Sequence, residues 1–218
     1  EKCLTEFKDN RYNIILKARQ LGISTLSAGY SLWMMLFHND KNILVIATGK
    51  ETAKNLVTKV RVMYEGLPQW LKTGTEEINK LSLRFKNGSQ IKAIASNESA
   101  GRSEALSLLI IDEAAFIDRI DTIWTAAQQT LATGGGCIAL STPNGVGNWF
   151  HKQWLGAEEG TNEFHTIRLH WTDHPDRTEE WRKEQDKILG PSQAAQECDT
   201  DFLSSGQSVV DPAILQWY

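Results

Sequence analysis

The sequence has few cysteines and no long hydrophobic run. Cys3, Cys137 and Cys198 are odd in number and far apart, which argues against a disulfide framework and a zinc site and fits a reducing compartment. The longest apolar stretch, residues 28–37, is interrupted by polar side chains and is too short to span a membrane. We therefore expect neither a disulfide-stabilised scaffold nor a membrane protein.

An excess of basic charge is also absent. The 218 residues carry a formal net charge of −4, whereas a domain that grips DNA mainly through its phosphates is usually basic. Tight independent binding of DNA is therefore not expected. With 41% hydrophobic and 23% charged residues, the chain is typical of one globular domain with a small appended subdomain. It begins with Glu1 rather than Met, as a piece of a longer protein would.

Apolar strand-like runs alternate with helix-like segments over most of the chain. Asn87-Gly88, between alternating apolar residues, predicts a two-residue hairpin turn. Strands that alternate with helices of this length predict an α/β fold with a mostly parallel sheet flanked by helices. The expected strands are residues 12–16, 42–48, 108–111 and 137–140, and the expected helices are residues 24–38, 51–64 and 121–132.

The composition changes from about Phe164. A strand at residues 165–170 leads to two helical segments rich in charge and glutamine, residues 179–189 and 192–198. We expect three units on this basis: a core at 1–163, a small second subdomain at 164–206 and a linker at 207–218.

The segment Lys17-Ala18-Arg19-Gln20-Leu21-Gly22-Ile23-Ser24-Thr25 connects the first expected strand to its helix. Such a turn can place main-chain N–H groups around a phosphate at a helix N-terminus. The common pattern G-x-x-x-x-G-K-[ST] has a lysine where this chain has Ile23. Lys17, at the position of the first glycine, can reach the same oxygens from the opposite side, and Arg19 offers a donor for a γ-phosphate. Taken alone, an ordinary strand-turn-helix with solvated Lys17 and Arg19 explains the segment equally well.

A second segment favours the interpretation as a phosphate site. The apolar run 108–111 ends in Asp112 and Glu113. Asp112 is placed to hold Mg²⁺, and Glu113 to orient the water that attacks a γ-phosphate. A buried strand followed by two acids is common by itself. Together with the first segment it is specific, because both fall where strands of an open α/β sheet end and ligands bind.

Two further features are weaker. Ser141-Thr142-Pro143 closes another strand, where hydroxyls can sense a γ-phosphate, although a polar turn opened by proline is the plainer interpretation. Arg102 lies in a loop where an arginine finger can act on a neighbouring subunit, although a surface arginine is the plainer interpretation of that residue alone.

These segments together resemble the deviant Walker A, Walker B and coupling motifs of large terminase subunits, the DNA-packaging motors of tailed bacteriophages. The likeness is greatest to T-even-like members, which often keep a lysine at the position of Ile23. It implies a RecA-like (ASCE) P-loop NTPase core with a small C-terminal lid. It also implies ATP and Mg²⁺ as ligands. The implied residues are Lys17, Arg19, Gln20, Gly22, Ile23, Ser24 and Thr25 at the nucleotide, Ser24 and Asp112 at the metal, Glu113, Arg102 and Arg19 in catalysis, and Ser141 and Thr142 in coupling.

The resemblance predicts an ATP-hydrolysing motor domain that drives double-stranded DNA into a procapsid. The implied partners are DNA, the portal protein, the small terminase subunit and further copies of the chain in a ring, with no membrane, in the cytoplasm of the infected host cell. Nuclease activity is not expected, because the chain stops near where the family's nuclease domain begins. A helicase-like or remodelling ATPase, or a nucleotide-binding module that does not hydrolyse, are the alternatives. Strong stimulation by nucleic acid would favour a helicase, whereas the Asp112-Glu113 pair counts against a binding module.

The chain is rich in tryptophan, with eight residues. Trp33 and Trp124 fall at helical spacing and are expected in the core. Trp149 and Phe150 follow the Ser-Thr-Pro segment. Core packing is their expected role, and a part in an adenine pocket is the alternative.

Overall fold

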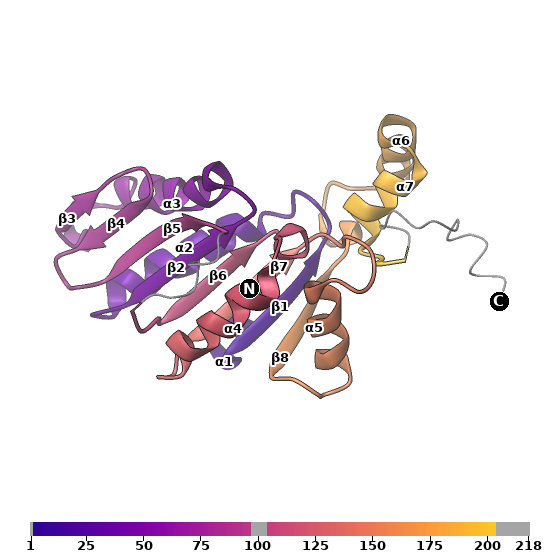
Figure 1. Cartoon of the computed structure of the whole chain (residues 1–218). Coiled ribbons are helices and arrows are strands. Elements are labelled where there is room, and N and C mark those ends of the chain that lie inside the picture. The colour runs from indigo at the N-terminus through magenta and orange to yellow at the C-terminus, as the bar shows by residue number, and fades with distance from the viewer. Residues whose placement is uncertain (1, 97–103, 204–218) are drawn as a thin grey trace.

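The computed structural model describes residues 2–96 and 104–203. Their strands form one eight-stranded sheet in the order β3-β4-β5-β2-β6-β7-β1-β8, which crosses the centre of Figure 1. The strands are β1 (Tyr12–Lys17), β2 (Asn42–Ala47), β3 (Thr75–Ile78), β4 (Ser82–Phe85), β5 (Gln90–Ala95), β6 (Leu108–Asp112), β7 (Gly136–Ser141) and β8 (Phe164–Leu169).

Most of the sheet is parallel, as the sequence predicts. Every neighbouring pair from β5 through β2, β6, β7 and β1 to β8 is parallel, whereas β3 and β4 extend the sheet as antiparallel strands. The central strands β1 and β6 are buried along their whole length. Strands covered on both faces are expected to be apolar throughout, and residues 108–111 are an example.

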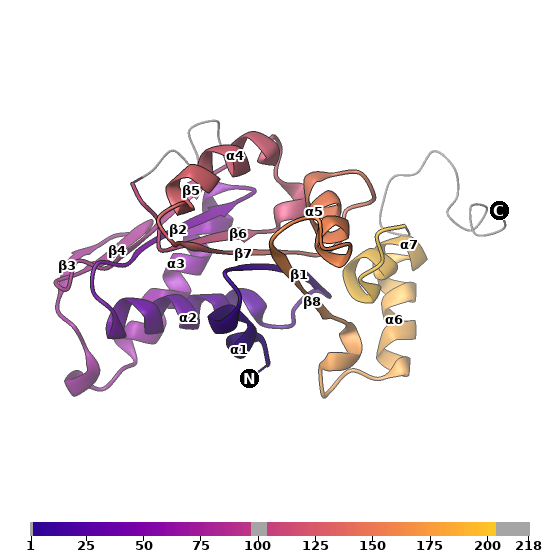
Figure 2. The same cartoon turned by 90° about the horizontal axis from the view of Figure 1, so that it is seen from below.

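Helices cover both faces of the sheet, as Figure 2 shows. Helices α1, α2 and α3 lie on one face, and α4 and α5 lie on the other. The helices on these faces are α1 (Lys2–Asp9), α2 (Ile23–Phe37), α3 (Lys50–Glu65), α4 (Ile120–Leu131) and α5 (Trp149–Glu158). This layered arrangement gives each apolar helix face a partner in the sheet.

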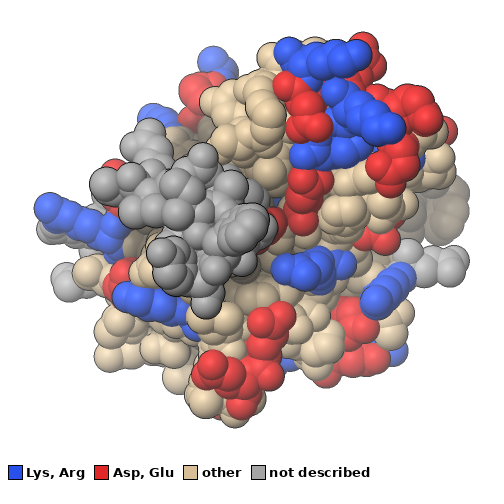
Figure 3. Space-filling model, turned by 90° about the vertical axis from the view of Figure 1, so that its right-hand side faces the viewer, with Lys and Arg blue, Asp and Glu red and all other residues tan. Residues whose placement is uncertain are grey.

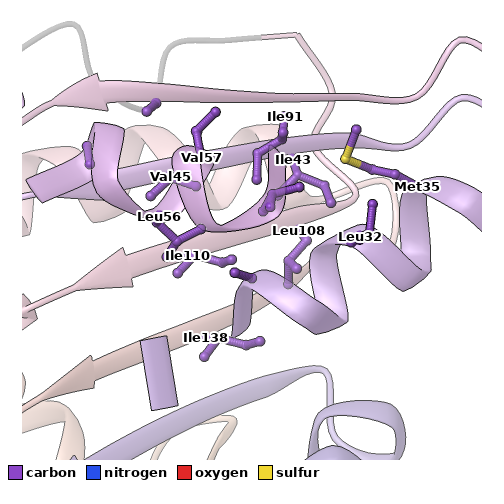
Figure 4. Packing of buried hydrophobic residues seen from close by; sticks show 14 of the residues in the cluster. Leu32, Met35, Ile43, Val45, Leu56, Val57, Ile91, Leu108, Ile110 and Ile138 are labelled. Atoms are coloured by element: carbon purple, nitrogen blue, oxygen red, sulfur yellow. The ribbon is translucent and has the colours of Figure 1, made fainter. Parts of the chain in front are cut away.

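Two hydrophobic clusters fill the space between the sheet and its helices. Figure 4 shows the cluster under α2 and α3, where Leu32 and Leu56 join Ile43, Ile110 and Ile138 of the strands. Burying a side chain of this size contributes about 1.5–3 kcal/mol. Because the same strands pack on both faces, their carboxyl ends are held in fixed relative positions.

The structure differs from the expected division at residue 164. Strand β8 pairs with β1 in register from Tyr12 opposite Phe164 to Lys17 opposite Leu169, so it belongs to the main sheet and not to a separate unit. After β8 the chain forms η3 (Trp171–Asp173), α6 (Glu179–Leu189), α7 (Pro191–Ala194) and the π-helix η4 (Ala195–Asp199). The helix expected at 192–198 is therefore two shorter elements. The expected linker at 207–218 lies outside the described residues.

This C-terminal segment, residues 171–203, stands at one end of the sheet in Figure 1. The Arg182 guanidinium joins its parts, because Nε and Nη2 donate to the two carboxylate oxygens of Asp199 at 2.7 and 2.6 Å. Figure 3 shows this side of the molecule, where acidic and basic side chains are intermingled. No uniformly basic surface is seen among the described residues on that face.

Several other expectations can be compared with the structure. A hairpin joins β4 to β5 at Asn87-Gly88 as predicted, but its loop is longer than the expected two residues, because Arg84 lies opposite Gln90. Helix α1, strand β3 and the one-turn helix η1 (Gln69–Leu71) have no counterpart among the expected elements. Trp124, Trp149 and Phe150 are core residues, but Trp33 is 42% exposed, so its expected core position is wrong. The three cysteines are buried and free. Within the described ranges, no helix is long and apolar enough to cross a membrane.

Candidate nucleotide-binding site

Three adjacent strands bring the expected functional segments together. In the sheet β7 lies between β6 and β1, with Asp112 opposite Leu140 and Leu16 opposite Ser141. The carboxyl ends of these parallel strands therefore meet at one edge, where ligands bind in open α/β sheets. Segments that are far apart in the sequence thus lie together at one edge of the sheet.

The loop between β1 and α2 has the backbone of an anion-binding turn. Gln20 and Gly22 have φ values of 59° and 77°, and α2 begins directly afterwards with no side chain capping its first turn. Uncapped N–H groups at a helix N-terminus favour an anion. The Ile23 side chain packs in the core, so only its main-chain N–H is available to a phosphate.

Lys17 points from the last position of β1 toward the acidic end of β6. Its Nζ lies 3.0 Å from Glu113 Oε1, and the two side chains are 6% and 32% exposed. Glu113 adopts a left-handed backbone conformation with φ 55° and ψ 46°, which is uncommon for a residue other than glycine. The two residues that the sequence assigns to phosphate and water are therefore direct neighbours.

Asp112 and Ser24 form the second contact of the site. Ser24 Oγ donates to Asp112 Oδ1 at 3.4 Å, and Asp112 is buried with 6% exposure. Burial, and secondarily the Glu113 carboxylate, raises the pKa of Asp112 above its usual value, although Lys17 and Ser24 act in the opposite sense. A divalent cation bound at this carboxylate and the neighbouring hydroxyl would stabilise the ionised form of the buried Asp112.

Ser141 and Thr142 are buried at the end of β7. Ser141 Oγ accepts a hydrogen bond from the Ala115 N–H at 3.2 Å. Ala115 belongs to η2 (Ala114–Phe116), the turn that starts directly after Glu113. The contact therefore links the expected coupling residues to the turn beside Glu113.

Arg19 lies on the outer side of the loop. Its side chain is 67% exposed and its Nη1 lies 3.1 Å from Glu197 Oε1. The loop main chain is held at two places, because the Ala18 N–H donates to the Leu169 oxygen at the end of β8 and the Arg19 N–H donates to the Glu197 oxygen. No sequence pattern indicated Glu197 as a partner, because the two residues are distant along the chain. Arg102, the expected finger, lies outside the described residues.

A large apolar cavity of about 710 Å³ opens beside the loop. Gly22 and Thr25 form the end nearest the loop, and Tyr30 and Trp33 of α2 form an aromatic wall, with their rings stacked at 5.5 Å. Helical spacing predicted Trp33 in the core. The prediction failed because α2 is apolar on more than one face, and spacing alone does not tell which face meets the sheet. The excess of apolar residues in α2 was the sequence signal that could have indicated a second apolar surface, away from the sheet.

No group of three or more metal-ligating His, Cys, Asp or Glu side chains occurs in the part of the chain that the structure describes. A metal at this site would therefore be bound by Asp112, Ser24 and the oxygens of a bound phosphate together, which is the usual way in which proteins hold Mg²⁺.

Comparison with known proteins identifies the family and the fold of the chain. The family described as terminase large subunit, T4likevirus-type, N-terminal, matches residues 14–211. The probable terminase large subunit gp28 of Escherichia phage Mu is 26% identical over 168 residues, which are 70% of this chain and 30% of that protein. The chain thus spans less than a third of that relative's length.

Solved structures show the same fold. The large terminase ATPase domain of Thermus phage P74-26 is 22% identical, with 89% of both chains covered and a TM-score of 0.71. The large terminase of the thermophilic bacteriophage D6E in complex with ADP is 14% identical, with 88% of this chain and 48% of that chain covered and a TM-score of 0.67. From the family match over residues 14–211, the chain belongs to the T4likevirus type of terminase large subunits, as part of their N-terminal region.

Proposed function

We propose that this chain is the ATP-hydrolysing motor domain of a terminase that drives double-stranded DNA into a viral procapsid. One observation carries the proposal: Lys17 at the end of β1, Ser24 at the start of α2, and Asp112 and Glu113 at the end of β6 meet at one edge of the sheet, across β7. That arrangement supplies a phosphate cation, a metal site and a carboxylate for water, which are the parts that phosphoryl transfer needs.

Each residue has one task in the proposed reaction. The N–H groups of the loop and of the first turn of α2, from Gln20 to Thr25, bind the phosphates, and Lys17 neutralises charge on them. Glu113 accepts a proton from the attacking water and orients it in line with the γ-phosphate. For this, the phosphate must take Lys17 away from its present contact with Glu113, at 3.0 Å.

Asp112 and Ser24 are the residues that would hold Mg²⁺, and their chemistry fits it. The metal, when bound, supplies positive charge at the phosphate oxygens. Arg19 is proposed for the γ-phosphate and would leave Glu197 to reach it. Arg102 stays a prediction as the finger that acts on a neighbouring subunit, and Ser141 with Thr142 as the coupling element.

The apolar cavity beside the loop is the proposed position of the nucleotide base. It begins at Gly22 and Thr25, where the phosphates would end, and Trp33 offers a flat aromatic surface. Stacking of this kind is worth about 0.5–1.5 kcal/mol beyond area burial. Replacing Trp33 by alanine should therefore weaken ATP binding about fivefold, whereas Trp70→Ala, at an 82% exposed site outside the cavity, should leave it unchanged. Equal affinities of the two variants would place the base elsewhere.

The proposed partners follow from the family. They are DNA, the portal protein of the procapsid, the small terminase subunit and further copies of this chain in a ring, in the cytoplasm of the infected cell. We also propose that residues 171–203 act as the lid, with the sheet and its helices, β8 included, as the core. The family match does not favour a helicase or a non-hydrolysing module.

The direct test is magnesium-dependent ATP hydrolysis by the chain and by Glu113→Gln. Loss of the carboxylate should lower turnover by about 10²–10⁴-fold and leave ATP binding within about twofold of the wild type, since the amide has a similar shape. Glu159→Gln, at an exposed position at the end of α5, is the matched control and should hydrolyse normally. Substantial turnover by Glu113→Gln would rule out the assignment.

A further inference from the structure

The turn after Glu113 is held by the segment after β7. The Ala115 N–H donates to Ser141 Oγ at 3.2 Å, and Asn144 Nδ2 donates to the Ala115 carbonyl oxygen at 3.1 Å. Both main-chain polar groups of Ala115 are therefore bonded to residues 141–144. Because buried main-chain groups are costly to leave unpaired, the turn and this segment move together.

This attachment fixes Glu113. Its backbone lies in the left-handed region, and a non-glycine residue stays there only where its surroundings hold it. Ala115, two residues further on, supplies the fixed point. The carboxylate of Glu113 is thereby kept at 3.0 Å from Lys17 Nζ.

The same segment is held from its other side by the C-terminal region. Gln196 Nε2 donates to the Pro143 carbonyl oxygen at 3.1 Å, and Gln196 lies in the π-helix η4. The ion pair of Arg182 with Asp199 anchors η4 to α6. A continuous series of hydrogen bonds therefore runs from residues 171–203 through residues 141–144 to the turn beside Glu113.

We propose that Gln196 and Asn144 are positioning residues that couple the place of the C-terminal segment to the place of the Glu113 carboxylate. Gln196 fixes the position of Pro143, and the next residue, Asn144, fixes the position of Ala115 through its own hydrogen bond. The inference rests on the proposed function of Glu113, and neither side chain needs to contact the nucleotide. Displacement of residues 171–203 then changes how well Glu113 faces its water.

The test compares turnover with nucleotide affinity in Gln196→Met, which removes the amide donor and keeps the length of the side chain. Loss of one neutral hydrogen bond should lower kcat about 3- to 10-fold and leave the Kd for ATP within about twofold. Gln193→Met makes the same chemical change at an exposed position of α7 and should alter neither quantity.

A double-variant comparison tests whether the two residues act in one series. Asn144→Ala should lower kcat to a similar extent, and Asn144→Ala/Gln196→Met should be no slower than the slower single variant. If Gln196→Met is unfolded at the assay temperature, Gln196→Asn replaces it, because it keeps an amide but is one methylene too short to reach Pro143.

The outcomes separate this inference from the function on which it rests. Glu113→Gln is measured in the same assay. If Glu113→Gln is inactive but Gln196→Met matches Gln193→Met, the positioning role is wrong and the function stands. Multiplying effects of Asn144→Ala and Gln196→Met would also overturn it. If Glu113→Gln retains turnover, the proposed function itself fails.

Discussion

The loop between β1 and α2 is held on its two sides by contacts of different character. On the inner side, toward the sheet, Lys17 lies 3.0 Å from Glu113, and both Lys17 and the neighbouring Asp112 are buried. On the outer side, Arg19 makes a contact of similar length with Glu197, 3.1 Å, but its side chain is 67% exposed. The distances are alike and the surroundings are not.

We expect this difference to separate the contacts that serve the proposed chemistry from those that hold the fold together. Charges act strongly on one another where water is excluded and are weakened by solvent at the surface. The inner contacts can therefore stabilise charge that develops on a phosphate. The outer contacts can exchange partners at low cost, as the roles proposed for Arg19 and for the C-terminal segment require. Substitutions on the inner side should thus have the largest effects on turnover, whereas the ion pairs that hold the outer C-terminal segment together should mainly contribute to stability.

Next to the loss of Glu113, the largest expected effect comes from removing the inner carboxylate Asp112. Asp112→Asn should lower magnesium-dependent hydrolysis at least about 100-fold, because a bound metal contributes several kcal/mol of charge stabilisation. The exposed Asp118→Asn is the control. Equal rates for the two variants would remove Asp112 from the site and would break the distinction between inner and outer contacts.

The same variant has an opposite effect on metal-free stability. Since burial raises the pKa of Asp112, the folded chain holds this proton more tightly than the unfolded chain. The free energy of unfolding therefore falls as pH rises from the usual range of aspartate through the raised pKa. Without magnesium, Asp112→Asn should be more stable than the wild type at neutral pH, and the difference should vanish in acid. Denaturant unfolding at several pH values measures it, and a less stable variant at neutral pH would contradict the raised pKa.

On the outer side, the largest expected effect is on stability. Arg182→Ala removes hydrogen bonds of 2.7 and 2.6 Å to Asp199 and one of 2.6 Å to Asp186. A partly buried bidentate pair of this kind should contribute about 2 kcal/mol to the free energy of unfolding. The exposed Lys183→Ala is the control and should change it by less than about 0.5 kcal/mol. If the two variants unfold alike, this ion pair does not hold the C-terminal segment together.

Much of the fold could be predicted from local patterns. The run 108–111 and the hairpin signal at Asn87-Gly88 indicate a strand and a reversal of the chain by themselves, and both occur. The length of the hairpin loop was not predicted correctly, because it depends on the register of β4 and β5. The position of β8 in the sheet could not be read from its composition, because pairing with β1 depends on how the chain returns in space. Short elements such as α1 and β3 carry too few residues for a periodic pattern.

The candidate site, like the fold, could be predicted only in part. Lys17, Asp112 and Glu113 could be placed because strand ends in a parallel sheet converge. Their contact at 3.0 Å, by contrast, depends on the left-handed conformation of Glu113, which no sequence pattern announced. Glu197 and Trp33 were missed, because one acts from a distant segment and the other faces a cavity from a helix that is apolar on several sides.

The most direct test concerns Lys17. It stands at the start of the loop between β1 and α2, whereas the common phosphate-binding pattern has its lysine at the end of the loop. Lys17→Ala should lower kcat/KM for ATP on the order of 100-fold, as expected for losing one donor that stabilises developing charge. It should also weaken ATP binding, while Lys152→Ala at an exposed site on α5 leaves both unchanged. We expect this loss both in magnesium-dependent hydrolysis and in equilibrium binding of ATP. Wild-type rates and affinity in folded Lys17→Ala would contradict the role of Lys17 at the phosphates.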